Sequence, residues 1–312
     1  CGDQLQDLYH IIEEGAFKTG DGTYEERTDI FDHYIEEMKG RINIQRPLKV
    51  VVDAGNGITG KFAPDLFRAF GCEVTELYCE LDGNFPNHEA NPEYAKNLKD
   101  LIQTMADGDY DLGIGFDGDG DRIGIVDENG KHYSADLHVL ILAQDVLTRH
   151  AGANIVFDVK ASQVVPNLIR EAGGNPVMAK TGHSFIEEAM RKNNALIGGE
   201  VSGHIFFAED YFGFDDAFLA ALRTIEMLSK SNAPLSSYFS DITKTYATPE
   251  IKVPCPDDQK FDVVDALRDH FERDYTCITL DGVRVHFDTD TWGIVRWSNA
   301  TPNLTMRFAA QS

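Results

Sequence analysis

The sequence has 312 residues, of which 42% are hydrophobic and 26% charged, as in a folded globular protein with room for two or three domains. Its net charge of −24 argues against a nucleic-acid partner, because proteins bind that backbone through clustered Lys and Arg side chains. No apolar stretch approaches the length of a membrane-spanning helix, so we expect no membrane partner.

The five cysteines form no Cys-X-X-Cys pair and are odd in number. This pattern argues against a structural zinc site and against a disulfide framework. A reducing environment fits it best, and we expect a cytoplasmic protein.

The first 28 residues combine a short amphipathic stretch, LQDLYHII, with the Gly- and Thr-containing segment GAFKTGDGTYEERT. The first stretch predicts a short helix and the second a linker. We therefore expect residues 1–28 to be the remnant of a preceding domain and the connection that follows it.

A first α/β domain is predicted over residues 29–131. The apolar strand PLKVVVD ends at Asp53 and leads through the turn AGNG to the helix APDLFRAFG and the strand EVTELYC. The same order returns over residues 132–243, where the strand ANIVFD ends at Asp158 and precedes the helix VVPNLIREAGG and the strand NPVMA. These repeats predict two tandem mixed-sheet α/β domains of similar topology.

Residues 244–312 follow a different pattern. One helix, KFDVVDALRDHFER, precedes a run of short strands in CITLDGVRVHF, GIVRWSN and LTMRFAA. A helix followed by consecutive strands predicts an α+β domain at the C-terminal end.

The segment FDGDGDR, residues 116–122, places Asp117, Asp119 and Asp121 at alternate positions between two apolar runs. Carboxylates that converge repel one another, and a divalent cation that prefers hard oxygen ligands removes the repulsion. We predict Mg²⁺ at these three aspartates. An acidic surface turn is the simpler alternative.

A calcium-binding module is a second alternative. Asp117, Asp119, Asp121 and Glu128 occupy the acidic positions of an EF-hand loop. Arg122, however, stands where the sharp turn of that loop needs glycine, and the flanking segments are typical of strands rather than helices.

An aspartate-nucleophile phosphatase is a third alternative. Asp117 would attack phosphorus and Asp119 would act as the acid. Other charged residues would complete that site: Lys160 or Lys180, with Asp215 and Asp216. The loop falls late in its α/β domain, whereas this function favours a position after the opening strand.

Four more polar stretches have loop positions: FDVK, KTGHS, GGEVSGH and RWSNATP. In the third, Glu200, Ser202 and His204 alternate, so an extended loop presents an acceptor, a hydroxyl and an imidazole on one side, which suits sugar hydroxyls. RWSNATP offers an arginine fork with hydroxyl and amide donors, a set that suits a phosphate dianion. Individually, each stretch also fits an exposed turn or a structural residue.

Taken together and in this order, the five motifs resemble those of the α-D-phosphohexomutase superfamily, most closely its bacterial phosphomannomutase/phosphoglucomutase branch. The segment DGNFPNHEANPE, residues 82–93, matches as well. The resemblance extends from about residue 29 to 310. It implies an isomerase that interconverts hexose 1-phosphate and 6-phosphate through a phosphoserine and a hexose 1,6-bisphosphate intermediate, with Mg²⁺, on a mannose or glucose phosphate.

The resemblance also implies a role for each motif. Asp117, Asp119 and Asp121 would hold Mg²⁺ beside the phosphoserine, with Arg122 near the transferring phosphoryl group. Lys160 and His183 would line the cleft. Glu200 and Ser202 would bind the sugar hydroxyls, with His204 supporting them. The loop of Arg296, Ser298, Asn299 and Thr301 would clamp the phosphate that does not react.

Three departures from the family pattern matter. Ala300 stands where a threonine is common in the phosphate loop, and Val201 where Met or Tyr is usual. The Ser-His-Asn-Pro-type loop that carries the nucleophile does not occur in this sequence. We therefore expect domains two to four of a monomeric mutase, inactive without the missing domain.

Overall fold

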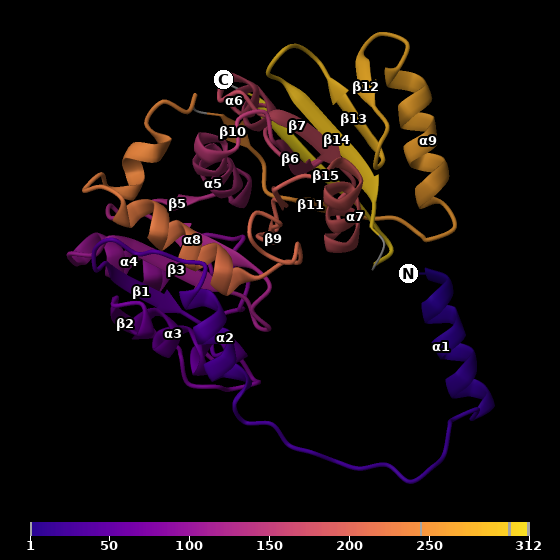
Figure 1. Ribbon diagram of the computed structural model, residues 1–312. Coiled ribbons are helices and arrows are strands. Elements are labelled where there is room, and N and C mark those ends of the chain that lie inside the picture. The colour runs from indigo at the N-terminus through magenta and orange to yellow at the C-terminus, as the bar shows by residue number, and fades with distance from the viewer. Residues whose placement is uncertain (1, 244, 299–300, 311–312) are drawn as a thin grey trace.

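Two mixed sheets and one antiparallel sheet follow one another along the chain (Figure 1). The computed structural model describes residues 2–243, 245–298 and 301–310. We refer to residues 30–133 as the first unit, residues 134–243 as the second unit and residues 245–310 as the third unit.

The first unit contains a five-stranded sheet in the order β2-β1-β3-β4-β5. Its strands are β1 (Lys49–Asp53), β2 (Glu73–Leu77), β3 (Leu112–Phe116), β4 (Ile123–Val126) and β5 (His132–Tyr133). Parallel pairing joins β1 to β2 and β3, and antiparallel pairing adds β4 and β5. The helices are α2 (Ile30–Lys39), η1 (Ile58–Lys61), α3 (Ala63–Ala69) and α4 (Lys99–Asp107). Since β5 belongs to this sheet, the sheet runs slightly beyond the boundary expected at residue 131.

The second unit repeats the arrangement with the order β7-β6-β8-β9. Its strands are β6 (Asn154–Asp158), β7 (Asn175–Ala179), β8 (Ile197–Gly199) and β9 (Ile205–Phe207). Again the first three strands are parallel and the last is antiparallel. The helices are α5 (Ala135–Arg149), α6 (Val164–Glu171), α7 (His183–Asn193), α8 (Ala217–Ser229) and η2 (Leu235–Phe239). The prediction of two α/β repeats of similar topology is confirmed.

Helices α5 and α8 connect the first two units, because each packs against strands of both sheets. Twelve of the thirteen residues of α8 are buried, and one hydrophobic cluster runs from Met38 in the first unit to Phe239 in the second. Asp216 caps α8 by accepting a hydrogen bond from Leu219 N, and it also accepts hydrogen bonds from the hydroxyls of Tyr34 and Tyr211. The first two units therefore share one core.

The third unit is an antiparallel sheet with one helix, as predicted from its pattern. Its elements are β10 (Tyr246–Ala247), β11 (Ile251–Pro254), α9 (Lys260–Phe271), β12 (Thr276–Ile278), β13 (Val283–His286), β14 (Trp292–Trp297) and β15 (Asn303–Ala310). The unit has its own small core. Arg284 fixes it to the second unit, since its buried guanidinium donates to the carbonyls of Val159 and Ala161 at 2.7 and 2.9 Å.

The N-terminal segment lies apart from the three units. Helix α1 (Gly2–Glu14) is followed by an exposed connection up to α2, which Figure 1 shows crossing open space at the bottom of the view. Among the described residues, no helix combines the length and the apolar character needed to cross a bilayer.

Candidate functional site

Two β-hairpin loops from equivalent positions in the first and second units meet at the candidate site. The aspartate loop, residues 117–122, joins β3 to β4, and the glutamate loop, residues 200–204, joins β8 to β9. Arg122 and His204 form an antiparallel bridge, and Ile123 N donates to Gly203 O at 3.1 Å. Backbone pairing therefore holds the two loops side by side.

Asp117 organises the aspartate loop. Its side chain is buried, and Oδ1 accepts hydrogen bonds from the backbone N–H groups of Gly120 and Arg122 at 3.0 and 3.1 Å. Oδ2 accepts a third bond from Arg122 Nε at 2.8 Å. Burial raises the pKa of Asp117 to about 6, although the charge of Arg122 acts in the opposite direction.

The three aspartates fit a hard divalent cation. Asp117, Asp119 and Asp121 each offer a carboxylate oxygen, and these oxygens lie within 4.8 Å of one another. Asp121 Oδ1 is buried and has no hydrogen-bond partner in the part of the chain that the structure describes. An oxygen-only set with one side chain open to solvent suits Mg²⁺, which keeps several water ligands.

His204 links the two loops electrostatically. Its Nε2 lies 3.4 Å from Asp121 Oδ2, and its Nδ1 lies 2.9 Å from both Glu200 Oε2 and Ser202 Oγ. Burial disfavours the imidazolium, but hydrogen bonds with Asp121 and Glu200 outweigh it and raise the pKa of His204 to about 9. Its hydrogen bond with Asp121 lowers the pKa of that carboxyl to about 2. Glu200, Ser202 and His204 thus share one side of the loop, as their alternation predicted.

The segment before α7 is held by carboxylates from three parts of the chain. Gly182 N donates to Glu200 Oε1, Thr181 Oγ1 donates to Asp158 Oδ2 at 3.2 Å, and Thr181 N donates to Asp281 Oδ2 at 3.1 Å. His183 follows as the first residue of α7, with its ring centroid 6.2 Å from that of His204. His183 therefore lies beside the glutamate loop.

The phosphate loop predicted in the third unit contacts other residues of that unit, and the sequence did not indicate these contacts. The buried Arg296 donates through Nε and Nη2 to Asp281, at 2.9 and 3.4 Å. Ser298 Oγ lies 2.9 Å from Thr301 Oγ1, and the buried Lys260 donates to Ser298 O at 2.7 Å. Asn299 lies outside the described residues.

Lys160 follows β6 and turns towards the third unit. Its buried ammonium group donates to Glu250 Oε2 at 3.2 Å. Burial opposes its charge, but Asp158, Glu250 and Glu93 more than compensate and raise the pKa of Lys160. Within the described ranges, this lysine therefore meets an acid from the chain between β10 and β11, a partner that sequence reasoning missed.

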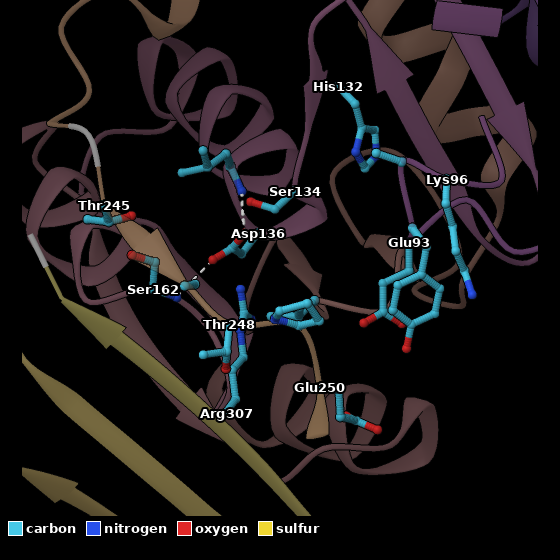
Figure 2. Close-up of a pocket in the computed structure, with 16 residues that line it drawn as sticks. Glu93, Lys96, His132, Ser134, Asp136, Ser162, Thr245, Thr248, Glu250 and Arg307 are labelled. Carbon is cyan, nitrogen blue, oxygen red and sulfur yellow. Dashed lines mark hydrogen bonds between the residues drawn. The ribbon is translucent and has the colours of Figure 1, made fainter. Parts of the chain in front are cut away.

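A cavity of about 580 Å³ opens where the three units meet (Figure 2). Figure 2 shows Glu93, Asp136, Ser162 and Arg307 around it, with Asp136 accepting hydrogen bonds from the backbone of Leu137 and Ser162. Its lining contains none of the site residues predicted from the sequence. Val201 of the glutamate loop and Glu250, the partner of Lys160, nevertheless line it, so the cavity adjoins the candidate site that the polar residues of the two hairpin loops form.

The geometry bears on both alternatives for the aspartate loop. Strands β3 and β4 flank it, whereas an EF-hand needs helices there. Of the proposed phosphatase set, Asp215 lies close to Asp121, but Asp216 caps α8 and Lys160 pairs with Glu250, so the complete set is not assembled around Asp117. The side chain of Asp117 is also only 1% exposed, which leaves little room for nucleophilic attack.

Comparison with known proteins identifies the family. A family model described as "Phosphoglucomutase/phosphomannomutase, alpha/beta/alpha domain II" matches residues 32–130, and the corresponding domain III model matches residues 134–246. The phosphoglucomutase of Neisseria meningitidis is 43% identical over all of this chain and 68% of its own length. The phosphomannomutase/phosphoglucomutase of Pseudomonas aeruginosa is 44% identical over all of this chain and 67% of its own length. The chain belongs to the phosphoglucomutase/phosphomannomutase family.

A solved structure of a phosphoglucomutase/phosphomannomutase family protein from Burkholderia thailandensis supports the same assignment. It matches 99% of this chain and 66% of its own chain, with a TM-score of 0.92 and 40% identity. The family, the fold class and the isomerase class expected from the sequence are confirmed by these matches. The chain spans about two thirds of the length of these phosphoglucomutase/phosphomannomutase relatives.

Proposed function

We propose that the three units form the metal-binding and substrate-binding part of an enzyme that moves a phosphoryl group between the 1- and 6-positions of a mannose or glucose phosphate. The observation that carries the proposal is the pairing of the aspartate loop with the glutamate loop through Arg122 and His204. It brings oxygen ligands for a cation next to acceptors for sugar hydroxyls. Such a reaction depends mainly on positioning and charge stabilisation.

The aspartate loop would act on the phosphoryl group. Mg²⁺ held by Asp117, Asp119 and Asp121 would polarise phosphorus and neutralise negative charge in the transfer. Arg122 Nε is committed to Asp117, so the loop fixes the direction of the guanidinium and leaves other N–H groups to contact the transferring phosphoryl oxygens.

The glutamate loop would orient the sugar. A positively charged His204 beside Glu200 keeps that carboxyl ionised, and although burial favours the neutral form, the pKa of Glu200 is lowered. Glu200 can then accept hydrogen bonds from two neighbouring hydroxyls of a hexose, and Ser202 can donate or accept beside it. His183 and Lys160 would line the cleft around the sugar.

The third unit would hold the phosphate that does not react, through Arg296, Ser298 and Thr301 together with Asn299. The phosphoryl carrier would be a serine outside these motifs, because the sequence contains no Ser-His-Asn-Pro loop. A hexose 1,6-bisphosphate would be the intermediate, and we propose a monomeric, cytoplasmic enzyme.

Calorimetric titration of the 312-residue chain with glucose 6-phosphate in the presence of Mg²⁺ tests the proposal. We expect binding, and we expect Arg296→Lys to weaken it about tenfold, because lysine keeps the charge but loses the planar fork. Arg268→Lys is the matched control, since this arginine pairs with exposed acids on α9 itself. Equal affinity in Arg296→Lys, or Asp117-dependent release of inorganic phosphate from a simple phosphomonoester, would contradict the proposal and, in the second case, favour the phosphatase.

A further inference from the structure

Asp281 lies in the tight turn between β12 and β13, at the boundary between the second and third units. Its side chain is 6% exposed, and donors from two sides converge on it. Arg296 contributes Nε at 2.9 Å and Nη2 at 3.4 Å, and the backbone N–H of Thr181 contributes a third contact at 3.1 Å. One carboxylate thus joins the third unit to the segment that precedes His183.

The Asp-Gly sequence explains why the turn can approach β14 so closely. Gly282 has a φ of +78°, a conformation that residues with a side chain rarely adopt. A Cβ added at this position would lie 2.3 Å from Val295 O and 2.7 Å from the Cα of Arg296. The missing side chain therefore lets the turn press Asp281 against the base of Arg296.

Asp281 limits which N–H groups of Arg296 can reach a ligand. A guanidinium has five N–H donors, and Asp281 accepts from Nε and from one N–H of Nη2. Three donors remain, two of them on Nη1. Because Arg296 is itself 7% exposed, two contacts to one carboxylate fix the plane of the fork before a phosphate arrives.

The other end of the contact reaches the sugar side of the site. Thr181 N donates to Asp281, and the next N–H, that of Gly182, donates to Glu200. Glu200 and Arg296 are thereby connected through two consecutive backbone amides. A shift of the third unit away from the second would break the contact between Thr181 and Asp281.

We propose that Asp281 is a positioning residue that orients the Arg296 fork for phosphate and couples it to the Thr181–Gly182 segment and Glu200. The proposal rests on the function proposed above and adds a residue to it. Asp281 does not touch the substrate in this role. It sets the distance between the group that holds the phosphate and the group that holds the sugar hydroxyls.

If charge alone mattered, removing the negative charge of Asp281 would have the opposite effect on phosphate affinity from the one expected of a positioning residue. A carboxylate next to a phosphate-binding arginine repels a phosphate dianion, so its neutralisation would strengthen binding if charge alone mattered. If Asp281 positions the fork, its replacement by asparagine should weaken binding. Asparagine keeps one acceptor oxygen and has an NH₂ group in place of the second, so it cannot accept from both Nε and Nη2 of Arg296 in the same way. The sign of the change in affinity separates the two accounts.

The test is calorimetric titration of the chain with glucose 6-phosphate in the presence of Mg²⁺. We expect Asp281→Asn to weaken binding about tenfold, as for the loss of a hydrogen bond to a charged group, with the affinity for Mg²⁺ unchanged. Asp265→Asn, an exposed acid on α9 that pairs with Arg268, is the matched control and should have no effect. In an Arg296→Lys background, Asp281→Asn should add little further loss, because both changes remove one contact. Unchanged or tighter binding in Asp281→Asn overturns the proposal.

A second measurement needs no sugar and reports on the coupling directly. In ¹H–¹⁵N spectra of the chain, Arg296→Lys should move the Thr181 amide resonance and speed its hydrogen exchange, because Arg296 and the Thr181 amide both donate to the carboxylate of Asp281. An unchanged Thr181 amide overturns the coupling. If the unmodified chain binds no glucose 6-phosphate, the proposed function fails, and the Thr181 measurement still decides whether Asp281 connects the two segments.

Discussion

The aspartate loop and the glutamate loop occupy the same place in two sheets that share the order of four strands, yet they offer a ligand different sets of groups. Both are hairpin loops that leave the third strand and return in an antiparallel fourth strand. The first gathers three carboxylates that could hold a cation, whereas the second surrounds an imidazole with a carboxylate and a hydroxyl. The repeated fold therefore fixes where a site lies, and the loop sequence decides its chemistry.

The aspartates that end the first strand of each sheet, Asp53 and Asp158, also occupy equivalent positions but have different partners. Asp53 ends β1 and contacts only its own unit, accepting hydrogen bonds from Gly55 N at 2.9 Å and from His88 Nε2 at 3.0 Å among the described residues. Asp158 ends β6 and accepts from Thr181, whose backbone amide reaches the third unit. Both aspartates therefore bond within their own unit, but Asp158 holds the threonine that contacts Asp281 of the third unit.

The largest expected effects come from matched truncations in the two sheets. Ile114 on β3 and Ile197 on β8 are both fully buried in central strands. Each change to alanine should lower the free energy of unfolding by about 3 kcal/mol, because it leaves a cavity in a packed core. Urea unfolding monitored by circular dichroism measures both. Because the first two units share one core, a single transition is expected in each variant, and two separate transitions would show that these units unfold independently.

Removing one carboxylate from the aspartate loop should abolish Mg²⁺ binding there and leave the hydrogen bonds of the glutamate loop unchanged. We expect Asp119→Ala to weaken Mg²⁺ binding at least about 100-fold, since even residues behind metal ligands contribute tenfold to 100-fold. Asp65→Ala, which removes an exposed acid on α3, is the control. Isothermal titration with Mg²⁺ measures the change. Persistent binding after alanine replaces Asp117, Asp119 and Asp121 together would show that the cation lies elsewhere.

The contact between the loops should give the smallest effect, visible as a pH dependence. The pKa of His204 is raised to about 9 in the folded chain from an ordinary value near 6.5. A raised pKa contributes stability that is complete below about pH 6.5 and is lost as pH rises through about 9. We expect unmodified protein to lose about 1 to 2 kcal/mol more than His204→Gln between these pH values, measured by urea unfolding with a chelator present. Parallel pH profiles for the two proteins would mean that His204 does not hold the loops together.

Local sequence patterns predicted most of the fold and the loops of the site. Apolar runs ending at Asp53 and Asp158 predicted the opening strands, because a short apolar run that ends at a turn is typical of a buried strand, although both aspartates are themselves buried. The pairings of Arg296 with Asp281 and of Lys160 with Glu250 were not predictable in this way. Their partners lie in other elements, and only the packing of the units and the hairpin turn at Gly282 bring them together. A signal was present in the Asp-Gly turn, which places an acid at a defined position but does not indicate its partner.

The backbone bridge between Arg122 and His204 limits how far the repeated units can be treated as exchangeable parts. Repeated α/β units suggest that a relative's first unit could be grafted onto this chain with its metal ligands intact. Here, however, the aspartate loop and the strand after it contact the next unit, through a backbone hydrogen bond to Gly203 and through His204 beside Asp121. A chimaera therefore has to take both loops from the same parent protein. The smallest part of this site that can be transferred intact is the pair of hairpins.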